Sequence, residues 1–134
     1  MVGGTILPVG TVIGGGGTTP FPIYRGGYPP QGKKGPTLPP PKGKDFGYPP
    51  GGSHPPHVGP GIQPGMGASG RSDIGPPMKL PYFVMPEGTV LPIGIRVIVD
   101  PGGHITIAPD YDMPWIEYQQ FWNEIRWHIL PSDE

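Results

Sequence analysis

The chain has 134 residues, a formal net charge of −1 and no cysteine, so a disulfide framework is excluded. No apolar run approaches the roughly 18 residues of a membrane-spanning helix, and we expect no membrane span. Glycine and proline supply 38 of residues 1–78 but only 11 of residues 79–134. Because glycine loses much backbone entropy on folding and proline cannot donate to a sheet or helix, the two parts are expected to differ in structure.

This contrast predicts three segments. Residues 1–19 are expected to form an apolar, strand-like segment that ends in a flexible glycine hinge, and residues 20–78 an irregular, extended Gly/Pro-rich arm. Residues 79–134 are expected to form a small α+β head, a β-hairpin followed by one C-terminal amphipathic helix. Residues 1–78 carry a net charge of +4 and residues 79–134 a net charge of −5. The arm should therefore be attracted to acidic surfaces, including the heads of neighbouring copies.

One short pattern occurs twice. Residues 4–13 read GTILPVGTVI and residues 88–97 read GTVLPIGIRV, at an offset of 84. The shared pattern is G-T-(I/V)-L-P-(V/I)-G, followed by β-branched residues that favour strands, while its proline restricts a strand to an edge or a bulge. The two copies could pair with each other, occupy equivalent grooves on a partner, or share the pattern by coincidence.

The Gly/Pro-rich segment offers aromatic side chains for protein contacts. Tyr28 and Tyr48 each precede a Pro-Pro pair in a second short repeat, where the ring and its hydroxyl suit docking on another protein. The only basic cluster lacks arginine and well-placed aromatic residues, so nucleic acid is not expected as a partner. That cluster consists of Lys33, Lys34, Lys42 and Lys44.

A β-hairpin is expected in the last third of the chain. A short strand is predicted at residues 80–85, and residues 93–99 alternate as a second strand. The sequence Asp-Pro-Gly-Gly at residues 100–103 is a reversal signal, because proline suits the second turn position and glycine suits positive φ. Residues 104–108 should return as the partner strand.

A C-terminal helix is expected next. Asp112 should cap a helix that runs from Pro114 to about residue 130. Apolar residues occupy both sides of this helix, and a head of about 56 residues can cover only one of them, so the other should contact a second subunit. The predicted protein-interface residues of the whole chain are Tyr28, Tyr48, Trp115, Tyr118, Trp122, Trp127 and Ile129.

Residue types that support catalysis occur without the patterns that catalysis needs. His54 and His57 lie close in sequence, but no third metal ligand is near them. No serine lies in a nucleophile-elbow context, and carboxylates such as Asp112 and Glu117 are explained by the start of the helix. We therefore expect no catalytic site, no metal and no cofactor.

The segments GTILPVGTVI and GTVLPIG resemble the P-(V/I)-G-T-(I/V) strand openings of phage tail-collar and fibre-type proteins. The resemblance covers about ten residues in each place. The chain lacks the tryptophan and Cys-Asp-Gly continuation of the collar family, and no functional residue is carried over. The resemblance implies a virion component of the tail or minor capsid type.

Together these observations predict a non-enzymatic structural component of a large assembly, a minor capsid or tail protein of a phage. It would be located in the virion, or in the host cytoplasm during assembly. Its arm would lie over neighbouring subunits, which are other structural proteins or further copies of the chain. The alternative is a soluble Pro-rich adaptor whose disordered arm recruits recognition domains.

Overall fold

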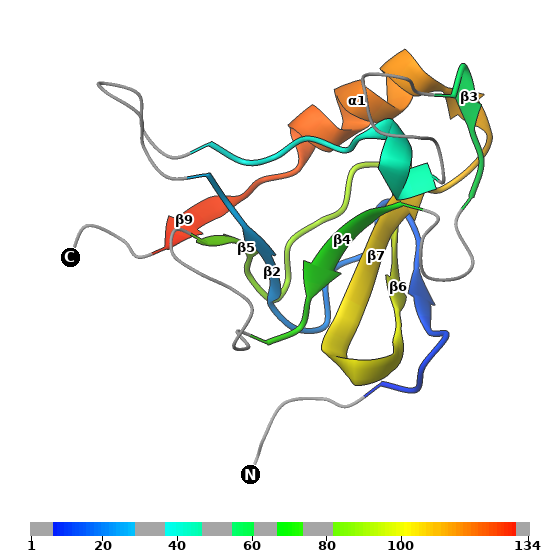
Figure 1. Cartoon of the computed structure of the whole chain (residues 1–134). Helices are drawn as coiled ribbons and strands as arrows, with labels where there is room; N and C mark the ends of the chain where they lie inside the picture. The colour runs from blue at the N-terminus through cyan, green and yellow to red at the C-terminus, as the bar shows by residue number, and fades with distance from the viewer. Residues whose placement is uncertain (1–6, 29–36, 47–54, 61–66, 74–81, 131–134) are drawn as a thin grey trace, which may run out of the picture.

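Antiparallel strand pairs make up most of the structure, which is a computed structural model that describes residues 7–28, 37–46, 55–60, 67–73 and 82–130. One helix, α1 (Trp115–Glu124), lies on one side of the strands (Figure 1). The strands are β1 (Val12–Ile13), β2 (Ile23–Gly26), β3 (His57–Val58), β4 (Ala68–Arg71), β5 (Tyr82–Met85), β6 (Ile95–Val99), β7 (His104–Pro109), β8 (Met113–Pro114) and β9 (His128–Leu130).

Strands from all three predicted segments join one seven-stranded sheet in the order β1-β6-β7-β4-β2-β5-β9, while β3 pairs with β8. The prediction of an extended arm over residues 20–78 is therefore not met in its described parts, since β2 and β4 lie inside the sheet. Its glycines permit close packing: a Cβ on Gly67 would lie 2.5 Å from the Ile107 carbonyl oxygen, and one on Gly70 would lie 3.2 Å from the Tyr24 carbonyl oxygen. Glycine here marks contact between backbones rather than disorder.

The predicted hairpin is confirmed. β6 and β7 pair antiparallel from Ile95 opposite Pro109 to Val99 opposite Ile105. In the turn between them, Gly102 has φ 72° and Gly103 has φ 81°, the left-handed conformation that glycine adopts without steric cost. The strand expected at residues 80–85 is β5, described from Tyr82 to Met85.

The helix is shorter than the sequence predicts. α1 ends at Glu124, Ile125 is extended, and residues 128–130 form β9, which pairs with β5. The expected helix to residue 130 is wrong, because pairing with the edge of the sheet prevails over local periodicity there. Asp112 does not cap the helix either, since Pro114 holds the N-cap position without a side-chain hydrogen bond.

The end of the first copy of the repeated pattern pairs with the end of the second copy, and the residues after the first copy run along the rest of the second. Residues 10–19 run antiparallel to residues 88–99, with Gly10 N–H donating to the Val99 carbonyl at 2.7 Å and Thr19 N–H donating to the Thr89 carbonyl at 2.9 Å. Between these bonds β1 pairs with β6, as Figure 1 shows for the N-terminal blue strand beside β6. Residues 14–17 are packed and not a free hinge, because a Cβ on Gly15 would lie 1.9 Å from the Ile93 carbonyl oxygen.

The core lies between α1 and the sheet. One face of the hairpin contributes to it, with Ile95, Val97, Ile105 and Ile107, together with the buried side of the helix and the Leu91 side chain of the second repeat. Its largest fully buried side chains include Tyr118, Ile23, Met85, Leu91, Ile95, Ile105 and Ile107.

Candidate functional site

The helical residues predicted to form a docking face are inside the protein. Trp115, Tyr118 and Trp122 are 6%, 0% and 4% exposed. Phe46 covers two of them, with ring centroids 5.8 Å from Trp115 and 5.5 Å from Tyr118 in edge-to-face contact. The prediction that these three residues form an exposed interface is therefore wrong, because the Gly/Pro-rich segment itself covers that side of α1.

Tyr118 is held by a polar contact as well as by packing. Its hydroxyl donates a hydrogen bond to the Ile107 carbonyl oxygen at 2.7 Å. Burial raises the pKa of Tyr118 above the usual value, because the anionic form loses its hydration. This residue therefore joins the helix to β7 as a neutral hydrogen-bond donor.

The other predicted interface residues have different surroundings. Trp127 is half-buried and its ring lies 5.8 Å from that of Trp122, while its Nε1 is buried with no acceptor among the described residues. Tyr28 and Ile129 are 45% and 43% exposed and remain accessible for contacts. Tyr48 lies outside the described residues.

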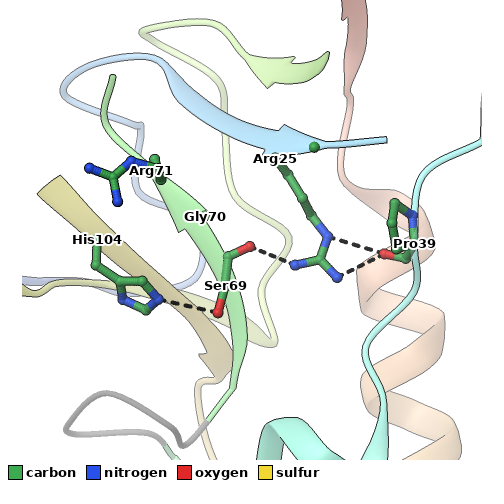
Figure 2. A pocket seen from close by; sticks show the side chains of 7 residues that line it. Arg25, Pro39, Ser69, Gly70, Arg71 and His104 are labelled. Atoms are coloured by element: carbon green, nitrogen blue, oxygen red, sulfur yellow. Dashed lines mark hydrogen bonds between the residues drawn. The ribbon is translucent and has the colours of Figure 1, made fainter. Parts of the chain in front are cut away.

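A surface groove opens where two neighbouring strands separate. β2 and β4 are in register only at Tyr24 and Arg71, so the strands part beyond that pair. The space has a volume of about 370 Å³. Figure 2 shows Arg25 reaching across it from β2 toward Pro39 and His104 pointing to Ser69 from the other side. The lining residues are Arg25, Gly26, Pro39, Ser69, Gly70, Arg71 and His104.

Arg25 is fixed by neutral partners. Its Nε and Nη2 donate to the Pro39 carbonyl at 3.1 and 2.9 Å, and its Nη1 donates to the Ser69 carbonyl at 2.6 Å. The guanidinium carbon lies 5.1 Å from the centre of the Trp122 ring, which is a cation–π contact. Burial lowers the pKa of Arg25, and the negative charge of Asp45 opposes that shift. The group stays charged, since arginine is protonated throughout the accessible pH range.

A chain of hydrogen bonds joins the other side of the groove to the hairpin turn. The Ser69 Oγ lies 3.2 Å from His104 Nε2, and His104 Nδ1 lies 2.7 Å from an Asp100 carboxylate oxygen. The same oxygen accepts a 2.5 Å bond from the Thr106 hydroxyl, and Asp100 is 3% exposed. These contacts hold His104 in one orientation beside the groove.

Ser69, His104 and Asp100 are hydrogen-bonded in the same order as the serine, histidine and aspartate of a catalytic triad. The other contacts of these residues differ from those of such a site. Acyl transfer needs N–H donors aimed at the oxygen that becomes negative in the transition state. The Arg25 N–H group that reaches Ser69 donates to its backbone carbonyl instead. Asp100 is also engaged by the turn, where its N–H donates to the His104 carbonyl at 2.9 Å. These contacts therefore give Arg25 and Asp100 partners in the strands and in the hairpin turn.

Sequence reasoning missed this groove. Its members are separated by 44 residues between Arg25 and Ser69 and by 35 between Ser69 and His104, so no local motif joins them. Over the described ranges, no group of three potential metal ligands occurs, and His57 is exposed on β3 while His54 is outside those ranges. A search of the same ranges finds no helix of the length and apolarity needed to span a membrane.

Comparison with known proteins finds no family model, no curated protein and no solved structure that matches the chain.

Proposed function

We propose that the protein is a non-enzymatic structural component of a large assembly, a minor capsid or tail protein of a phage virion. It would contact neighbouring subunits through the edge formed by its two repeats. This edge is the side of the molecule where residues 10–19 run along residues 88–99. The exposure of apolar side chains along it is the observation that supports the proposal.

Three of the eight exposed large hydrophobic residues in the described chain belong to this repeat edge, and a fourth, Val9, directly precedes it. Val9, Val90 and Ile93 are 62%, 63% and 63% exposed, and Val12 on the edge strand β1 is 43% exposed. Soluble monomers usually protect an edge strand with charge, and no charged residue occurs between positions 1 and 24. An apolar, uncharged sheet edge is typical of a surface that a neighbouring subunit covers.

The proposal is tested by identifying the proteins that bind the intact chain in the cells that produce it. The tagged full chain is purified under native conditions, and native mass spectrometry gives the composition and ratio of the complex. We expect a fixed stoichiometry with one or a few structural proteins, or with further copies of the chain. A monomer without a stoichiometric partner would contradict the proposal.

Two matched variants locate the contact. Ile93→Lys places a charge on the repeat edge, whereas Ile116→Lys places one at an equally exposed position, 64% against 63%, on α1. Ile93→Lys should abolish the complex while Ile116→Lys leaves it intact. If the complex contained many substoichiometric proteins and survived Ile93→Lys, the Pro-rich adaptor would be favoured instead.

The absence of enzymatic activity is tested at Ser69, the one serine whose hydroxyl is bonded to a histidine among the described residues. We expect no labelling of the folded protein by a fluorophosphonate probe and no hydrolysis of p-nitrophenyl acetate above that of Ser69→Ala. Labelling of Ser69 that requires His104 would overturn the non-enzymatic part of the proposal.

A further inference from the structure

We propose that the groove between β2 and β4 binds a small oxyanion, a carboxylate or phosphate group, with Arg25 as its principal ligand and the Ser69 hydroxyl as the second point of contact. This inference is independent of the assembly role, because the groove and the repeat edge involve different residues. It rests on the unused hydrogen-bond donors of Arg25, on the positive charge of its guanidinium and on the open volume of the groove.

Some N–H groups of Arg25 make no hydrogen bond to the described residues. A guanidinium carries five N–H groups. Three of them make the bonds to the Pro39 and Ser69 carbonyls, so Nη1 and Nη2 each keep one N–H group that is not used by the described residues. These bonds and the Trp122 ring also hold the guanidinium in a fixed orientation. A ligand would therefore meet a preorganised pair of donors with little loss of side-chain entropy.

Among the described residues, no ion pair neutralises the charge of Arg25. Buried or half-buried charges are normally paired with an opposite charge. Within the described part of the chain, the arginine–carboxylate ion pairs are Arg71 with Asp73 and Arg96 with Asp110, and His104 Nδ1 contacts the Asp100 carboxylate. No described carboxylate lies within 4 Å of Arg25, although Asp45 is close enough to influence its pKa. An oxyanion in the groove would supply the missing negative charge.

The opposite side of the groove adds polar groups without adding a free negative charge. The Ser69 hydroxyl is exposed and can donate to a ligand in place of His104. Asp100 is buried behind His104, and Asp73 is 3.3 Å from Arg71, so each acidic group is already engaged by a partner. A Cβ on Gly26 would meet no atom within 4 Å, so the β2 side of the groove is open.

Nuclear magnetic resonance of the full chain tests the inference. The ¹⁵N-labelled protein is titrated with sodium phosphate and, separately, with sodium acetate, at constant ionic strength kept with sodium chloride to separate binding from screening. We expect saturable shifts confined to the backbone amides of Gly26, Ser69, Gly70 and His104. Tighter binding of phosphate or of acetate identifies which oxyanion the groove prefers.

Variants assign the contacts. Arg25→Lys keeps the positive charge but loses the planar fork of donors, and should weaken binding about tenfold, the effect of one charge-assisted hydrogen bond. Ser69→Ala removes one exposed hydroxyl and should weaken binding about threefold without unfolding the chain. Arg126→Lys, an exposed position after α1, is the control and should leave the affinity unchanged.

The inference fails if neither anion gives saturable shifts in the groove. It also fails if shifts are spread over all basic residues, or if Ser69→Ala binds as the unaltered chain does. Since Ser69→Ala tests the groove even if Arg25→Lys does not fold, the result is decisive in either case. Failure here would leave the assembly proposal untouched, because its test depends on Ile93.

Discussion

The two copies of the G-T-x-L-P-x-G pattern each close a turn at the same position, but only the first turn has its glycine at positive φ, with Gly10 at 93°. Thr11 N–H donates to the Pro8 carbonyl at 3.1 Å, and Ile95 N–H donates to the Pro92 carbonyl at 3.0 Å. The residue after each proline is exposed to the same extent, as Val9 and Ile93 show. The shared pattern thus places a turn at the same point, while the neighbours in space determine what each residue of the pattern contributes to stability.

The leucines and glycines of the two copies show this difference. Leu91 is 1% exposed and belongs to the core, whereas Leu7 is only half-buried. Gly10 has φ 93° and open space around it, while a Cβ on Gly94 would lie 2.3 Å from the Phe121 ring. The first glycine is required by its backbone conformation and the second by close approach of an aromatic side chain.

The largest effect is expected from the leucines. Leu91→Ala should lower the free energy of unfolding by about 3 kcal/mol, because it leaves a cavity in the core. Leu7→Ala should lower it by about 1 kcal/mol or less, since solvent already reaches that side chain. Urea denaturation of the two variants measures the difference, and equal losses would show that the copies are energetically equivalent.

A smaller effect is expected from overpacking at the second glycine. Gly94→Ala should lower the free energy of unfolding by about 2 kcal/mol, because the Phe121 ring has to move away from the new methyl group. Phe121→Leu combined with Gly94→Ala should restore part of the loss. A cost that stays the same in the double variant would mean that the backbone, not the ring, limits the position.

The first glycine should be less sensitive. Gly10→Ala should lower the free energy of unfolding by about 1 kcal/mol, the cost of placing a side chain at positive φ without a steric clash. Gly10→Asn is the matched control, since asparagine tolerates this conformation better, and it should cost less than alanine. Thermal unfolding followed by circular dichroism orders the three proteins, and alanine at or above the stability of asparagine would contradict the explanation.

The smallest effect on stability is expected at the residue after each proline, which is equally exposed in the two copies. Val9→Lys and Ile93→Lys should each change the free energy of unfolding by less than about 0.5 kcal/mol, because both side chains are exposed. Both should nevertheless weaken the complex by which the proposed assembly role is tested. A large loss of stability in either variant, measured by urea denaturation, would mean that the repeat edge acts within the chain.

Only the local part of the fold could be predicted from the sequence. The β6–β7 hairpin follows from alternation and a turn signal within fifteen residues, from Ile95 to Pro109, and it is confirmed. The end of α1 depends on whether residues 128–130 meet β5, which periodicity cannot show. The Gly/Pro content of residues 20–78 predicted an arm, because composition does not distinguish a flexible glycine from one such as Gly70 that lies against a neighbouring strand.

The candidate groove depended entirely on tertiary structure. Arg25, Ser69 and His104 become neighbours only through the strand order β7-β4-β2. The burial of Trp115 and Trp122 likewise depends on Phe46 and Arg25, which come from the segment that the sequence predicted to be extended. In both the groove and the helix, the contacts join residues that are far apart in sequence, so neither helical nor strand periodicity could predict them.

The order of strands also has a consequence for how the chain folds as it is synthesised. Only β6 and β7 are consecutive in sequence among the neighbours in the seven-stranded sheet. Strand β1 is synthesised before its partner β6 and has to wait for it, and β5 has to wait for β9. Such long-range pairing folds slowly. The repeat edge is therefore completed only after residue 99 has been synthesised, which would delay any association through it until then.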